Sequence, residues 1–210
     1  MEKYKIILAS SSPRRIEMLK KNGIDPVVIP SYVDESLPVN MDPREAVMTL
    51  ALKKAQYVDS LVTEGGLPAA PGICTASSDE PRLILGADTI VFLDRIIGKP
   101  RDRGEAYEIL DQLRGKEHFV ATGVAILKAG TNERRIFCEI TKVFFKDYSD
   151  EEIRTYIETD EPYDKAGGYA IQGAWGDKVE RIEGDYDNVV GFPWARIKKE
   201  LDCFVLGWQI

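Results

Sequence analysis

The chain has 210 residues, of which 44% are hydrophobic and 30% charged, and its formal net charge is −7 at pH 7. The composition is ordinary for a globular protein, and the length suffices for one large domain or for two lobes. The negative charge argues against general binding to nucleic acid, which needs a basic surface, and against an electrostatic membrane anchor.

Cysteine and histidine are used sparingly. Cys74, Cys138 and Cys203 lie far apart and form no C-x-x-C pair, so neither a zinc knuckle nor a redox pair is indicated. This usage is typical of a reducing cytosol. His118 is the only histidine, so any metal should be hard and bound by oxygen, as Mg²⁺ or Mn²⁺ are. No signal-peptide pattern or membrane-length apolar run is found, so we expect a cytoplasmic protein with no membrane partner.

The first predicted elements are a short strand at residues 5–9 and a helix that a serine-rich turn introduces. Ser12 suits the N-cap, and Pro13 suits the first helical position. The turn presents backbone amides at the positive end of the helix dipole, beside the guanidinium groups of Arg14 and Arg15. This arrangement is typical of an anion site, and phosphate is the first candidate. The alternative is that both arginines are solvated charges, although cations are unfavourable at this end of a helix.

The next predicted helix places a cation on its apolar face. A strand around residues 26–30 and a loop at residues 31–41 lead to a helix over residues 43–62, which Asp42 caps. Lys54 falls near the centre of the apolar stripe when residues are placed at roughly 100° intervals. Lysine is almost never fully buried without a partner. Its side chain either extends along the apolar face to the surface or presents a cation to a cleft.

A central strand with an acidic residue in its middle follows a long loop. The loop, at about residues 63–81, is rich in glycine, proline, alanine and serine, and we assign it no chemistry. Residues 83–93 are apolar on both faces, as in a central strand. Asp88 shares a face with Gly86, while Thr89 points the other way. An unpaired carboxylate here would be costly, so a cation or a metal satisfies Asp88, or it is protonated; alternatively, it caps nearby backbone.

The second half of the chain begins with a hairpin turn, after which Lys99 lies near the end of a strand. An amphipathic helix is predicted at residues 101–114. Two long strands at residues 119–127 and 134–145 should form an antiparallel pair. A capping box opens a further helix at residues 149–158. The order of elements predicts an α/β fold with a mixed sheet, in two lobes around a cleft.

The last segment combines paired glycines with an amide side chain. The glycines at residues 167–168 allow close backbone approach. Gln172 carries a donor and an acceptor, so it can read the edge of a base. The alternative is an ordinary glycine-rich turn before an edge strand. A closing helix is predicted to end near Leu201.

A series of motifs, taken in order, resembles the Maf family of nucleoside triphosphate pyrophosphatases over nearly the whole chain. The serine-proline-arginine-arginine turn and the Gly-Ala-Asp-Thr strand are the most specific. The matching segments are Ala9 to Arg15, Asp34 to Ser36, Ala51 to Ala55, Gly86 to Thr89, Gly98 to Asp102, Asp164 to Gly167 and Ile171 to Gly173.

The resemblance implies one domain over residues 1–210, with an elongated mixed sheet, flanking helices and two lobes around a cleft, as in inosine-triphosphate pyrophosphatases. It implies cleavage of a nucleoside triphosphate between the α- and β-phosphates, with Mg²⁺ or Mn²⁺. Asp88 matches the proposed general base, and Glu35, Lys54 and Lys99 match other active-site positions. Asp88 and Glu35 are also the candidate metal ligands.

The candidate substrate-binding residues divide into two groups. The serine-arginine turn provides the phosphate contacts, at Ser10, Ser12, Arg14 and Arg15. By resemblance, substrate choice involves Arg15, Thr89 and Gln172.

The glutamine resembles the dTTP/UTP branch of the family, because it can pair with the O4 and N3–H edge that uracil and thymine share. A housecleaning role in the nucleotide pool and a homodimer are both compatible with the resemblance. The competing interpretation is a non-enzymatic regulator of cell division and septum formation that acts through partner binding. An inward lysine and a mid-strand aspartate favour the enzyme, because perturbed buried charges gather at catalytic sites.

Overall fold

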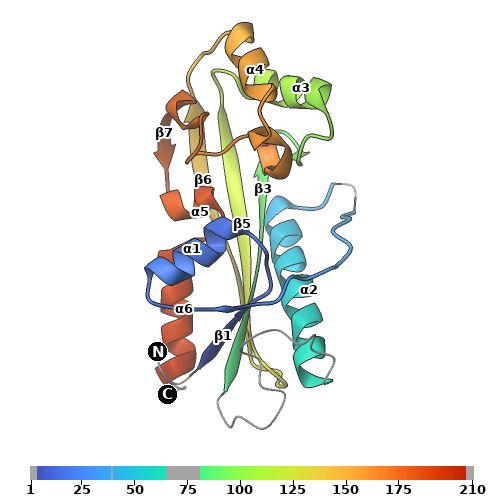
Figure 1. The fold of residues 1–210 in the computed structure, drawn as a ribbon, viewed down its shortest axis with the longest axis vertical. Coiled ribbons are helices and arrows are strands. Elements are labelled where there is room, and N and C mark those ends of the chain that lie inside the picture. Colours follow the sequence, from blue (N-terminus) through green and yellow to red (C-terminus); the bar gives the residue numbers. More distant parts are fainter. Residues whose placement is uncertain (1–3, 39, 65–80, 207–210) are drawn as a thin grey trace. The chain divides into compact units, whose positions relative to one another are not determined.

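The computed structural model describes residues 4–38, 40–64 and 81–206 (Figure 1). Most of the predicted surface loop, residues 65–80 with Cys74, lies outside the described residues. The chain forms two compact units, in line with the expected lobes. Unit 1 consists of Met1–Asp88, Gly123–Cys138 and Trp194–Ile210, and unit 2 consists of Thr89–Thr122 and Glu139–Pro193.

The strands form a mixed sheet in the order β2-β1-β3-β5-β6-β7, with β4 beside β3. β1 runs parallel to both β2 and β3, whereas β4 is antiparallel to β3 and β7 is antiparallel to β6. Their bounds are β1 (Lys5–Leu8), β2 (Val27–Val28), β3 (Arg82–Phe92), β4 (Ile96–Ile97), β5 (Glu117–Lys128), β6 (Arg134–Phe145) and β7 (Val179–Glu183). The mixed α/β fold is therefore confirmed.

The pairing of the two longest strands also agrees with the prediction. The amide of Lys128 donates to the carbonyl of Glu133, and the amide of Phe145 donates to the carbonyl of Lys116. Residue numbers rise along one strand as they fall along the other, so β5 and β6 are antiparallel neighbours.

Six α-helices accompany the strands in the described residues. They are α1 (Pro13–Lys21), α2 (Pro43–Thr63), α3 (Arg103–Leu113), α4 (Asp150–Ile157), α5 (Tyr186–Val190) and α6 (Trp194–Leu206). The predicted capping box of α4 is present, because Ser149 and Glu152 each bond the backbone of the other. Across the described segments, no helix is both long enough and apolar enough to cross a membrane.

Ser12 caps α1 through its backbone and not, as its residue type suggests, through its side chain. Within the described residues its hydroxyl makes no capping hydrogen bond. Its carbonyl instead accepts from the amides of Arg15 and Ile16. Asp42, by contrast, accepts from the amides of Arg44 and Glu45 through its side chain, as predicted.

Two glycines bring α2 unusually close to the strands of unit 1. A Cβ added to Gly86 would lie 2.2 Å from the carbonyl oxygen of Ala51, and one added to Gly123 would lie 2.3 Å from that of Val47. Figure 1 shows α2 on one side of these strands and α6 on the other. The close approach buries the small residues Ala51 and Ala55 against β3.

The core of unit 2 is rich in aromatic rings. Tyr156 stacks on Trp175 with 4.5 Å between ring centroids, and Tyr148 meets Trp175 edge-on. Gly167 has a φ of +73° and faces Val91 at a distance that leaves no room for a side chain. These contacts fix the glycine-rich segment that carries Gln172.

Candidate active site

The turn between β1 and α1 is built around Arg15. One guanidinium nitrogen, Nη1, donates to the carbonyl oxygen of Ala87 at 2.8 Å and to the hydroxyl of Ser10 at 3.2 Å. That hydroxyl also accepts from the amide of Ser12 at 3.3 Å. Burial lowers the pKa of Arg15, while the carboxylate of Asp88 opposes that shift. Arg15 is therefore tied to β3, and its interpretation as a solvated surface charge is wrong.

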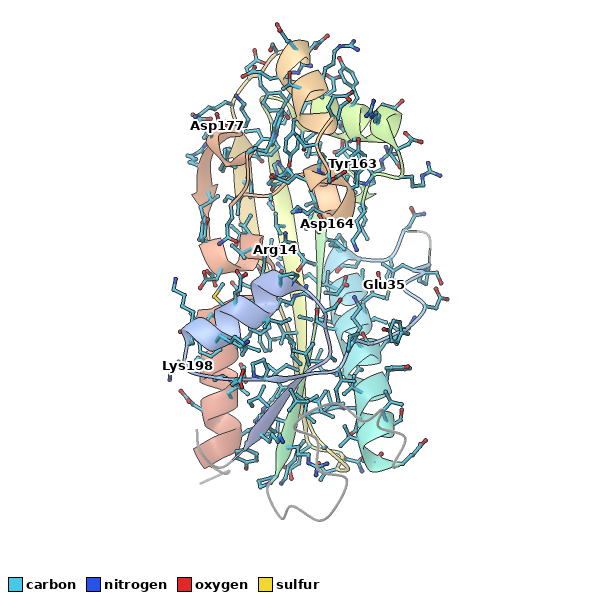
Figure 2. The ribbon with its side chains drawn as sticks, in the orientation of Figure 1. Arg14, Glu35, Tyr163, Asp164, Asp177 and Lys198 are labelled. Carbon is cyan, nitrogen blue, oxygen red and sulfur yellow. The ribbon has the colours of Figure 1, made fainter. Side chains whose placement is uncertain are left out.

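Arg14 is half-buried in the first turn of the same helix. Figure 2 shows it on α1, with Glu35 on the loop that precedes α2. No aspartate or glutamate stands in the first turn of α1, where acids would stabilise the helix dipole. The positive end of this helix dipole thus remains suited to an external anion.

Lys54 joins two carboxylates. Its Nζ lies 2.6 Å from Oδ1 of Asp88 and 2.6 Å from Oε1 of Glu35. Lys54 is 9% exposed and Asp88 is 8% exposed. The lysine is therefore a buried, paired cation and does not extend to the surface. For Asp88 the partner is this cation.

The sequence places these groups together through the spacing on α2 and β3. Asp88 lies on the same face of β3 as Gly86, and that face contacts α2 at Ala51 and Ala55. Lys54 lies on this inward face of α2, directly before Ala55. The glycine therefore brings the helix within reach of the aspartate.

The loop that carries Glu35 has its own support. The carboxylate of Asp34 accepts from the amide of Ser36 at 2.9 Å and from its hydroxyl at 2.6 Å. These bonds lower the pKa of Asp34, so the turn keeps a charged carboxylate. Glu35 stands between the two residues, which directs it towards Lys54.

The donor set of unit 1 suits a hard divalent cation. Asp88 and Glu35 supply the carboxylate oxygens that Mg²⁺ prefers, and Nζ of Lys54 lies between them in this structure. The described residues hold no group of three or more metal-ligating side chains. An ion bound by these carboxylates would take its remaining ligands from substrate phosphates and water, which is usual for Mg²⁺.

Comparison with known proteins then decides the family. The family model described as "Maf-like protein" matches residues 5–204. The chain belongs to the Maf family.

Relatives of similar length carry one name. The dTTP/UTP pyrophosphatase of Caldicellulosiruptor bescii is 44% identical over 194 residues, which cover 92% of this chain and 91% of that protein. The dTTP/UTP pyrophosphatase of Bacillus cytotoxicus is 44% identical over 205 residues, which cover 97% of each chain. That of a Geobacillus species is 43% identical over 204 residues, which cover 97% of this chain and 98% of that protein.

Three residues that the Maf resemblance singled out belong to unit 2. The hydroxyl of Thr89 lies 3.0 Å from that of Thr122. Lys99 is exposed and follows β4. Gln172 is exposed in a turn. The remaining candidates, Ser10, Ser12, Arg14, Arg15, Glu35, Lys54 and Asp88, belong to unit 1.

The turn that carries Gln172 is held by a residue that sequence reasoning missed. The carboxylate of Glu161 accepts from the hydroxyl of Tyr156 at 2.9 Å and from the amide of Ala174 at 3.3 Å. A Cβ added to Gly173 would lie 2.0 Å from this carboxylate. A side chain at residue 173 would therefore have to displace this carboxylate from the turn.

Thr122 and Asn188 were missed as well, and both are completely buried. The signal for Thr122 was a hydroxyl within an otherwise apolar strand. The signal for Asn188 was an amide beside two valines. Buried polar groups of this kind need hydrogen-bond partners, so each residue type in these apolar surroundings indicates a buried polar contact.

Proposed function

We propose that this Maf-family protein hydrolyses dTTP and UTP between the α- and β-phosphates, releasing the monophosphate and pyrophosphate. The observation that carries the proposal is the buried Lys54, shared by Asp88 and Glu35. Relatives whose alignments cover more than 90% of this chain carry the name dTTP/UTP pyrophosphatase, and this name supports the choice of substrates.

Phosphate binding falls to the serine-arginine turn. The start of α1 offers the positive end of its helix dipole, and Arg14 and Arg15 offer guanidinium groups that suit phosphate oxygens. Ser10 and Ser12 line the same turn, and Ser10 also holds Arg15 in place. Such preorganised donors stabilise the charge that develops on the transferring oxygens.

Asp88 is proposed as the general base. It takes a proton from water as the water oxygen forms a bond to phosphorus and the bond to the bridging oxygen breaks. Lys54 holds the carboxylate in position before the proton arrives. Lys99 is proposed as a further cation for the polyphosphate.

A divalent cation, Mg²⁺ or Mn²⁺, is proposed as the cofactor, with Asp88 and Glu35 as its protein ligands. When bound, it would withdraw charge from the phosphate oxygens. The paired carboxylates support this assignment, since one or two carboxylates are the usual protein share of a magnesium site.

Base choice is proposed for Gln172 and Thr89. The amide of Gln172 can pair with the O4 and N3–H edge of uracil or thymine. If Gln172→Glu leaves the preference for UTP over CTP unchanged, Gln172 does not read the base. We also propose that the enzyme works in the cytoplasm, clears unwanted nucleotides from the pool and forms a homodimer.

The test is a panel of canonical and modified nucleoside triphosphates with Mg²⁺ or Mn²⁺, with pyrophosphate and orthophosphate measured separately. We expect pyrophosphate from UTP and dTTP, and a loss of about 100-fold or more in Asp88→Asn. Asp94→Asn, an exposed aspartate at the next turn, is the matched control. Near-normal turnover by folded Asp88→Asn would refute its role, and no release from any nucleotide would favour the regulator of septum formation.

A further inference from the structure

Gln172 lies in a β-turn whose backbone is closely held. The amide of Gly173 donates to the carbonyl of Ala170 at 3.1 Å. This bond closes a turn that has Ile171 and Gln172 at its centre. A Cβ added to Gly176 would lie 2.3 Å from the carbonyl oxygen of Ile171, so the backbone that follows packs directly against the turn. The backbone of Gln172 therefore has a defined place within unit 2.

Glu161 ties this turn to α4. Its Oε1 accepts from the hydroxyl of Tyr156 at 2.9 Å, and its Oε2 accepts from the amide of Ala174 at 3.3 Å. Hydrogen bonds to a carboxylate are stronger than those between neutral groups. A Cβ added to Gly173 would lie 2.0 Å from Oε1, so the carboxylate lies against the turn itself. We call the contacts of Glu161 with Tyr156 and Ala174 the turn clamp.

The far end of the turn clamp is fixed in the aromatic core of unit 2. Tyr156 and Trp175 are both buried, and their rings stack with 4.5 Å between centroids. Trp175 directly follows Ala174 in the chain, so the same ring stack also holds the end of the turn. Burial and the bond to Glu161 raise the pKa of Tyr156, so its hydroxyl stays protonated and donates.

The position of the turn suggests a purpose beyond stability. Gln172 and Ala174 are both exposed, so these residues add little to the core. A side chain that reads a base must instead have its amide in a defined place, because hydrogen bonds weaken steeply when they are misaligned. A misplacement of about 1 Å can reduce the rate of a reaction about 100-fold.

We infer that Glu161 is a positioning residue for base selectivity, because it holds the turn from which the amide of Gln172 meets the O4 and N3–H edge of uracil or thymine. This inference rests on the proposed reading of the base by Gln172. Glu161 acts through Gln172, so its loss should change the choice of base more than the chemical step.

The experiment measures kcat/KM for pyrophosphate release from UTP and from CTP, and calorimetry gives the affinities for UMP and CMP. Wild-type protein is compared with Glu161→Ala, which removes the turn clamp. It is also compared with Glu161→Gln, whose amide can still accept from Ala174 and donate to the oxygen of Tyr156. Thermal melting shows whether each variant is folded. Gly173→Ala, which displaces the carboxylate, replaces Glu161→Ala if the latter does not fold.

Two tyrosines provide a matched pair of variants. Tyr156→Phe removes the hydroxyl that donates to Glu161 and keeps the ring that stacks on Trp175. Tyr163→Phe also removes a hydroxyl close to Glu161 in sequence, but this hydroxyl donates to the carbonyl of Ile157 at 2.6 Å. That bond does not involve the turn (Tyr163 is labelled in Figure 2).

We expect the preference for UTP over CTP to fall about fivefold to tenfold in Glu161→Ala and in Tyr156→Phe, the value of one oriented hydrogen bond. The change should arise mainly through KM. Glu161→Gln and Tyr163→Phe should retain the preference. In a Gln172→Ala background, Glu161→Ala should not reduce it further, because the effect passes through Gln172.

The other outcomes separate this inference from the proposed function. If Gln172→Ala abolishes the preference while folded Glu161→Ala and Tyr156→Phe keep it, the inference alone is overturned. An equal loss of activity on both nucleotides would mean a merely structural role and has the same consequence, as does a further effect of Glu161→Ala in the Gln172→Ala background.

The calorimetry tests the inference when turnover fails. A preference for UMP over CMP that depends on Glu161, without release of pyrophosphate from any nucleotide, supports the inference and overturns the proposed hydrolysis. If wild-type protein shows no preference, or if Gln172→Ala keeps it, both the inference and the reading of the base by Gln172 are overturned.

Discussion

At the scale of single residues, the site depends on a lysine whose charge would be costly to bury among apolar residues without a partner. Lys54 lies on the apolar face of α2 and is tolerated because two carboxylates share its charge. Buried ion pairs of this kind contribute little net stability, yet removing one partner leaves an uncompensated charge. The ion pair therefore serves the chemistry of the site, and mutation of either partner should destabilise the fold.

Lys54→Met should lower the free energy of unfolding by about 3 kcal/mol, because Asp88 would keep a buried charge without its partner. Lys53→Met is the matched control, since Lys53 is exposed one position away, and its effect should stay within about 0.5 kcal/mol. Denaturant unfolding measures both. The double variant Lys54→Met/Asp88→Asn should regain part of the loss, and additive losses would argue against coupling of the two residues.

His118 should make stability depend on pH. Its Nε2 lies 2.8 Å from the hydroxyl of Tyr169, and burial lowers its pKa from 6.5 to about 4. His118 therefore binds a proton more readily in the unfolded chain than in the folded protein. The stability from this group is complete above pH 6.5 and is lost as pH falls towards 4. The free energy of unfolding should fall by up to about 3 kcal/mol over that range.

The control for this prediction is His118→Phe, which keeps a ring but cannot titrate. Unfolding curves of both proteins should be recorded between pH 7 and pH 4. The wild-type curve should fall more steeply, and the difference between the two isolates His118 from the carboxylates that titrate nearby. Parallel curves would contradict the prediction.

At the scale of elements, the seating of α2 on β3 sets the geometry of the ion pair. Gly86→Ala should lower the free energy of unfolding by about 2–3 kcal/mol or more, because its Cβ would meet backbone atoms of Ala51 and Ala55. Gly98→Ala is the control, since a Cβ there meets nothing within 4 Å. Thermal and denaturant unfolding compare them. Equal stability of the two variants would mean that α2 can shift without cost.

The helices with local signals were predictable from the sequence. Asp42 with its following proline marks the start of α2, and Ser149 with Glu152 marks the start of α4, because capping involves residues close in sequence. α5 was not predicted as an element, and β7 was raised only as an edge strand after the glycine-rich turn, without bounds. They are short, and distant residues such as Thr141 hold their surroundings in place. Local propensity cannot report such contacts.

The candidate site was predictable in part. Asp88 and Lys54 stood out because each places a charge where the pattern demands an apolar residue. Glu35 lies on an exposed loop, so only the family resemblance identified it. Its contact with Lys54 joins a loop to a helix and leaves no local trace in the sequence. Asp88 was open to four interpretations, namely a partner cation, a metal, protonation or backbone capping, and the structure shows a cation 2.6 Å away.

At the scale of the whole molecule, the proposed metal should matter for activity and not for the fold. The carboxylates that would bind it already have Lys54 as a partner without the metal. Treatment with EDTA should therefore reduce pyrophosphate release by about 100-fold or more, and Mg²⁺ or Mn²⁺ should restore it. The melting temperature should change by less than about 2 °C. A large drop in melting temperature would indicate a structural ion elsewhere.

The interleaving of the two units bears on how the protein is made and how it can evolve. Unit 1 is interrupted by both segments of unit 2 and is completed only by Trp194–Ile210. The hydroxyl of Tyr4, beside β1, bonds the carbonyl of Phe204 in α6. On the ribosome, β1 therefore leaves the exit tunnel long before its packing partner is synthesised, and unit 1 must wait in an incomplete state. For the same reason, recombination at the boundary after Asp88 would transfer only part of each unit, and neither segment would contain a complete unit.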